Sequence, residues 1–147
     1  MTGRAVWPDR MKKVSLFVPC LTDLFYPQVA VATVRVLRRL GIDVTFPQEQ
    51  TCCGQPAFNA GDHSSAREVA RHMIRIFDGG EPVVTPSGSC CAMVREHFAE
   101  LFANDSLWRE RAAGLAGRTF EIVEFIEKVL QPDLGGLRLP EPVTATY

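Results

Sequence analysis

The sequence predicts an α/β domain of three layers, in which helices flank a short parallel β-sheet in a Rossmann-like arrangement. Three short apolar runs with β-branched and aromatic residues alternate with longer segments whose apolar residues recur at helical spacing. Glycine and proline separate these segments. The 147 residues, 46% of them hydrophobic, are enough for one domain with a buried core.

The first strand–helix–strand unit occupies residues 14–46. Residues 14–19 (VSLFVP) form an apolar run of strand length, typical of a buried parallel strand. A helix follows over 27–40, with proline at its first position and Gly41 at its end. Residues 42–46 (IDVTF) predict a second strand. This order is the minimal unit of a parallel sheet.

The pattern then repeats in outline. Asp62 is placed to cap a helix, and residues 82–85 (PVVT) predict a third strand. Ser89 is expected to cap the next helix, because a hydroxyl there can accept a backbone hydrogen bond. Asp105 and Thr119 are expected to cap two further helices.

Three segments divide the chain. Residues 1–10 read as a flexible N-terminal extension, 11–131 as the domain, and 132–147 as an irregular tail rich in proline and glycine. The last residues, 142–147 (PVTATY), resemble the start of a further strand. An unpaired edge strand is a surface that another chain can cover, which predicts a homodimer.

Composition and charge exclude several classes of partner. The chain carries 16 basic and 17 acidic residues, a net charge of −1, which gives no attraction for nucleic acid or an anionic membrane. Its apolar runs are too short to span a bilayer. Residues 1–10 lack the apolar centre of a signal peptide, so we expect a cytoplasmic protein with reduced cysteines.

All five cysteines follow predicted strands. Cys20 comes after the first strand, Cys52 and Cys53 after the second, and Cys90 and Cys91 after the third. Because the carboxyl ends of parallel strands lie at one edge of a sheet, these thiols are expected to meet there. Clustered cysteines without an obligatory histidine are typical of iron–sulfur clusters and of structural zinc.

Residues beside the cysteines are candidates for supporting such a centre. Three residues are placed to hydrogen-bond cluster sulfurs: Gly54 and Gln55 through their backbone amides, and Ser89. Cys91 either points into the core or provides a fifth ligand. A thiol–disulfide enzyme based on Cys52 and Cys53 is less favoured, because adjacent cysteines close only a strained ring.

Three stretches, "PCLTD", "CCGQPAFNAG" and "PSGSC", resemble the cysteine-rich CCG domain, which occurs in the lactate utilization protein A group, in the iron–sulfur subunit of glycolate oxidase and in the cysteine-rich subunit of heterodisulfide reductase. The resemblance covers residues 11–130 and implies an iron–sulfur cluster, of the [4Fe–4S] type, that transfers electrons among the subunits of a complex oxidising lactate or glycolate. By position, Cys20, Cys52, Cys53 and Cys90 match the cysteine motif. Residue 93 is methionine, so the Cys-x-x-Cys of the heterodisulfide reductases is absent. These proteins usually carry two such modules, and this chain resembles the first.

No organic active site is evident. The sequence has no Ser/His/Asp order, no phosphate-binding loop of the Walker type and no GxGxxG. We therefore expect a non-catalytic electron-transfer subunit, with the hydroxy acid oxidised on a partner. The alternative is a zinc-binding or metal-free assembly module of the same complex.

Overall fold

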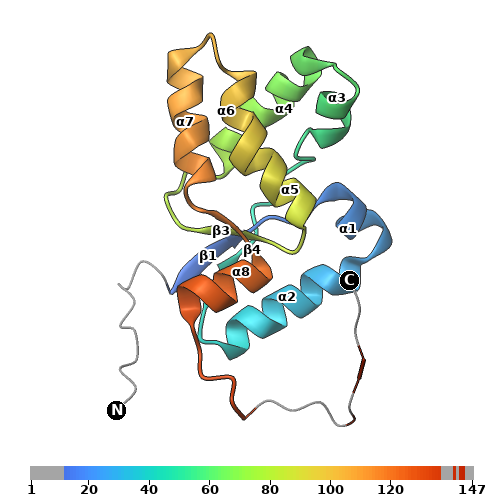
Figure 1. The fold of residues 1–147 in the computed structure, drawn as a ribbon, viewed down its shortest axis with the longest axis vertical. Coiled ribbons are helices and arrows are strands. Elements are labelled where there is room, and N and C mark those ends of the chain that lie inside the picture. Colours follow the sequence, from blue (N-terminus) through green and yellow to red (C-terminus); the bar gives the residue numbers. More distant parts are fainter. Residues whose placement is uncertain (1–11, 137–140, 142, 145–147) are drawn as a thin grey trace.

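The computed structural model describes residues 12–136, 141 and 143–144. Their centre is a parallel sheet of four strands in the order β2-β1-β3-β4 (Figure 1). Val14 pairs with Val44, Leu16 with Val84, and Val84 in turn with Phe120. The strands are β1 (Lys13–Leu16), β2 (Asp43–Thr45), β3 (Val83–Thr85) and β4 (Thr119–Glu121).

Helices cover both faces of the sheet, which confirms the predicted three layers (Figure 1). One face carries α2 (Pro27–Arg39) and α8 (Ile122–Glu124), the latter continued by the π-helical turn η3 (Phe125–Leu130). The other face carries α4 (His63–Ile76), α5 (Gly88–Ala92), the π-helical turn η2 (Met93–His97), α6 (Phe98–Leu101) and α7 (Ser106–Ala116). Two short helices, α1 (Cys20–Phe25) and α3 (Gln55–Asn59), follow the first two strands.

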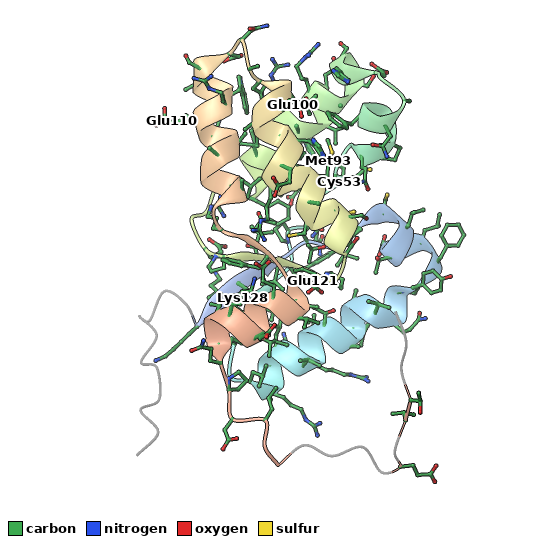
Figure 2. The ribbon with its side chains drawn as sticks, in the orientation of Figure 1. Cys53, Met93, Glu100, Glu110, Glu121 and Lys128 are labelled. Carbon is green, nitrogen blue, oxygen red and sulfur yellow. The ribbon has the colours of Figure 1, made fainter. Side chains whose placement is uncertain are left out.

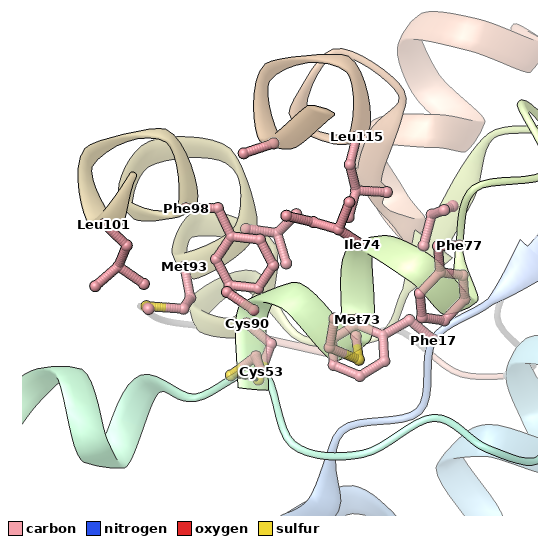
Figure 3. Packing of buried hydrophobic residues seen from close by; sticks show 14 of the residues in the cluster. Phe17, Cys53, Met73, Ile74, Phe77, Cys90, Met93, Phe98, Leu101 and Leu115 are labelled. Carbon is pink, nitrogen blue, oxygen red and sulfur yellow. Dashed lines mark hydrogen bonds between the residues drawn. The ribbon is translucent and has the colours of Figure 1, made fainter. Parts of the chain in front are cut away.

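The alternation of side chains along the strands divides the core in two. Val83 belongs to the larger cluster, which lies under α4 to α7, and its neighbour Val84 belongs to the smaller one, under α2 and η3. Figure 3 shows the larger cluster, with the buried rings of Phe17 and Phe77 in edge contact. Cys53 and Cys90 are members of this cluster and lie at its border.

Helix starts follow the predicted capping in two cases and differ in two others. The carboxylates of Asp62 and Asp105 accept backbone hydrogen bonds at the starts of α4 and α7, as predicted. The cap of α5 is Ser87 rather than Ser89, because the Ser87 hydroxyl accepts the amide of Cys90. The last helix is capped by Glu121, not by Thr119.

Thr119 belongs to a fourth strand that the sequence analysis did not predict. The segment Thr119–Glu121 pairs with β3, and the Thr119 hydroxyl donates to the carbonyl of Leu115 instead of capping a helix. Glu121 ends the strand and caps α8 through its carboxylate. Pairing with β3 thus places in a strand three residues that local capping rules assign to a helix.

The ends of the chain are only partly described. The predicted extension over 1–10 and most of the predicted strand over 142–147 lie outside the described residues. Among the helices of the described residues, none combines the length and the apolar character needed to cross a membrane.

Candidate metal centre

The structure brings four thiols from three separate segments together as two pairs. Cys20 opens α1, just beyond β1, and its Sγ lies 3.6 Å from the Sγ of Cys52. The Sγ of Cys53 lies 3.4 Å from that of Cys90, in the first turn of α5. All five cysteines are free thiols. The two pairs are joined by the peptide bond between residues 52 and 53, at the edge where the parallel strands end.

The thiols of Cys53 and Cys90 are buried and joined by one hydrogen bond. The Cys53 thiol donates to Cys90, which raises the pKa of Cys53 and lowers that of Cys90 to about 6. Hydrogen bonds from the hydroxyls of Ser87 and Ser89 also lower the pKa of Cys90. The lowered pKa of Cys90 favours the thiolate, the form in which cysteine binds metals. Figure 3 shows the two residues together, and Figure 2 places Cys53 near Met93.

The pair Cys20 and Cys52 is open to solvent. Cys20 is exposed and Cys52 is partly buried. Burial raises the pKa of Cys20, and the hydrogen bond with Cys52 raises it further. The amide of Gly54 donates to the Cys52 sulfur over 3.3 Å. One side of the centre thus faces the core and the other faces solvent.

Backbone amides near the sulfurs come from the turn that starts at Gly54. This glycine has φ +82°, a conformation that other residues rarely adopt, and it precedes α3. The turn aims two consecutive amides at sulfur, that of Gly54 at Cys52 and that of Gln55 at Cys53. The predicted surroundings of the sulfurs (Gly54, Gln55 and Ser89) therefore lie beside the thiols, together with Ser87, which the prediction left out.

Gln50 holds the loops of the exposed pair in register, and the sequence analysis missed it. Its side-chain oxygen accepts the amide of Val18, 2.7 Å away, and its nitrogen donates to the carbonyls of Leu16 and Pro47 at 3.0 and 2.8 Å. These bonds tie the end of β1, which leads to Cys20, to the loop that leads to Cys52. A lone glutamine in a loop gives no sequence signal for such contacts.

Cys91 lies apart from the two sulfur pairs. It is 4% exposed, and burial raises its pKa. Its charged neighbours are Arg95, which hydrogen-bonds the thiol, and Glu121 and Glu124. Arg95 also forms a 2.7 Å ion pair with Glu124. The neighbours of the Cys91 side chain are therefore charged groups, whereas the thiols of Cys53 and Cys90 contact each other.

The separations within the two thiol pairs suit metal binding. Two thiolates on one tetrahedral metal, with bonds of about 2.3 Å, are separated by about 3.8 Å. The separations of 3.6 and 3.4 Å are close to this value, so each pair can serve one metal atom. Within the described residues, no three Cys, His, Asp or Glu side chains are arranged to hold one metal ion.

The fold and the paired thiols define the protein as a cysteine-rich α/β domain. Comparison with known families gives the same class. The profile of the CCG cysteine-rich domain matches residues 14–95, more than half of the chain. The chain therefore belongs to this family. The match contains all five cysteines.

Comparison with curated proteins finds similarity to proteins named lactate utilization protein A. The chain is 48% identical over 118 residues to lactate utilization protein A 2 of Bacillus cereus strain 03BB102, which is 80% of this chain and 49% of that protein. Lactate utilization protein A 1 of Bacillus anthracis strain CDC 684 is 47% identical over the same shares. Lactate utilization protein A of Geobacillus thermodenitrificans is 48% identical over 132 residues, which is 90% of this chain and 55% of that protein. The chain spans about half the length of these relatives.

Proposed function

We propose that the region from β1 to η3 is an iron–sulfur module that transfers electrons within a complex for the use of lactate or a related 2-hydroxy acid. Cys20, Cys52, Cys53 and Cys90 hold the cluster. The observation that carries the proposal is the meeting of these thiols in two pairs at one edge of the sheet. The substrate class comes from the names of the relatives.

The residues around the thiols support a cluster in chemical terms. A bound iron–sulfur cluster accepts and releases single electrons, and hydrogen bonds to its sulfurs set its potential. The amides of Gly54 and Gln55 donate to the ligand sulfurs. The hydroxyls of Ser87 and Ser89 favour the thiolate of Cys90. Cys91 is not needed for this ligand set.

The experiment is the metal content of protein purified without oxygen. We expect iron and acid-labile sulfide in the wild-type protein, and a loss of both in Cys53→Ser. Cys91→Ser is the matched control, because it changes the adjacent thiol of α5, and it should retain both. One zinc per chain without sulfide would instead favour the alternative of a zinc-bound assembly module.

A further inference from the structure

Helix α1 and the turn after it form an exposed apolar surface beside the thiols. Four large side chains, here called the α1 patch, are between 59% and 72% exposed: Leu21, Leu24, Phe25 and Tyr26. No residue of α1 is buried. Asp23 is the sole charged residue of 20–29. In Figure 1, α1 lies at the periphery, outside the two helical layers.

This surface is unusual for a helix of a globular domain. Single exposed apolar residues are normal, but several together mark a contact surface. Burying large apolar side chains stabilises a protein, and these four side chains remain in contact with water. With one carboxylate and no basic residue, the patch suits an apolar protein surface and not an anionic ligand or nucleic acid.

The α1 patch is continuous with the open side of the metal centre. Cys20 is the first residue of α1 and is exposed, whereas Cys53 and Cys90 are buried. A protein bound to the α1 patch would therefore also cover Cys20 and exclude water from that side of the centre.

We propose that the α1 patch docks the polypeptide that forms the remaining half of the lactate utilization protein A relatives. The chain matches 49% of the Bacillus cereus protein and 55% of the Geobacillus protein, so a comparable length of polypeptide accompanies the matched part in each. The occupant presents an apolar face to Leu24 and Phe25. The docking does not require the cluster, so it can fail or hold independently of the proposed function.

The test is hydrogen exchange of segment 20–27 in metal-free, reduced protein. The chain is measured alone and joined to the unmatched part of the Geobacillus protein. Docking should slow exchange in this segment by about tenfold or more, and slow the alkylation of Cys20. Leu24→Ser with Phe25→Ser should remove both effects. Leu107→Ser is the control, because this residue is 64% exposed and belongs to α7, a helix that lies away from α1 (Figure 1).

Two results would overturn the proposal. The first is hydrogen exchange of segment 20–27 that is equally fast with and without the joined part, together with an unprotected matching segment in the intact Geobacillus protein. The measurement on the intact protein is included because it does not depend on whether the hybrid folds. The other is protection that rises with the concentration of the chain alone and that Leu24→Ser removes, since it would assign the α1 patch to a second copy.

Discussion

Cys90 and Cys91 are neighbours in sequence, yet they occupy different chemical surroundings. Cys90 receives hydrogen bonds from Cys53, Ser87 and Ser89, which lower its pKa. Cys91 is buried beside Arg95, with a raised pKa. Because successive residues of a helix point about 100° apart, one can face the thiols while the other faces the base of α8. Side-chain direction thus separates a ligand candidate from a packing residue.

The first prediction concerns the pH dependence of the metal-free, reduced protein. The pKa of Cys90, about 6, is below the ordinary value near 8.5. Between these values the unfolded state binds the proton and the folded state does not, so the free energy of unfolding rises with pH. Above the ordinary value, the raised pKa of Cys53 reverses the trend.

The measurement combines thiolate absorbance with urea unfolding across this pH range. We expect a thiolate transition near pH 6 that Cys90→Ser removes and Cys91→Ser retains. The increase in stability with pH should disappear in the same variant. A wild-type protein whose thiols all titrate above about pH 8 would contradict the assignment.

A second prediction at this scale concerns Gly54. Its φ of +82° costs other residues about 1–2 kcal/mol, so Gly54→Ala should lower the free energy of unfolding by that amount. Gly114→Ala is the control: it lies within α7 with open space around an added Cβ, and it should stabilise by roughly 0.5–1 kcal/mol. Urea unfolding distinguishes them, and equal effects would refute the role of the Gly54 turn.

Among the elements, the loops that carry the thiols depend on contacts made by Gln50. Gln50→Leu removes hydrogen bonds to Leu16, Val18 and Pro47 and leaves backbone groups without these partners. We expect a loss of about 1–3 kcal/mol in the free energy of unfolding. Less iron should also be retained per chain, because Cys20 and Cys52 are no longer held together. Gln48→Leu, at an exposed position two residues away, should change neither quantity.

The elements also show what local sequence patterns can predict. The three apolar runs form strands at the expected places, because buried parallel strands need continuous apolar residues. β4 was missed because Thr119–Glu121 is short and takes its partner from β3, far away in sequence. The helix α1 was missed because its apolar side chains face outward and leave no buried stripe.

For the whole molecule, the parallel sheet explains why distant cysteines meet. Cys20, Cys52 and Cys90 follow β1, β2 and β3, and the common direction of these strands brings the loops to one edge. The parallel direction of the predicted strands could thus predict the convergence of the thiols. It could not predict their division into two pairs, which arises from the turn at Gly54, the cap at Ser87 and the contacts of Gln50.

The most direct test of the central claim is the electron paramagnetic resonance spectrum of protein reconstituted with iron and sulfide without oxygen. The proposed centre predicts a redox-dependent iron–sulfur signal that Cys20→Ser and Cys53→Ser alter or abolish and that Cys91→Ser leaves in place. A folded protein with reduced thiols that gives no such signal in any redox state, and that binds one zinc instead, would contradict the account.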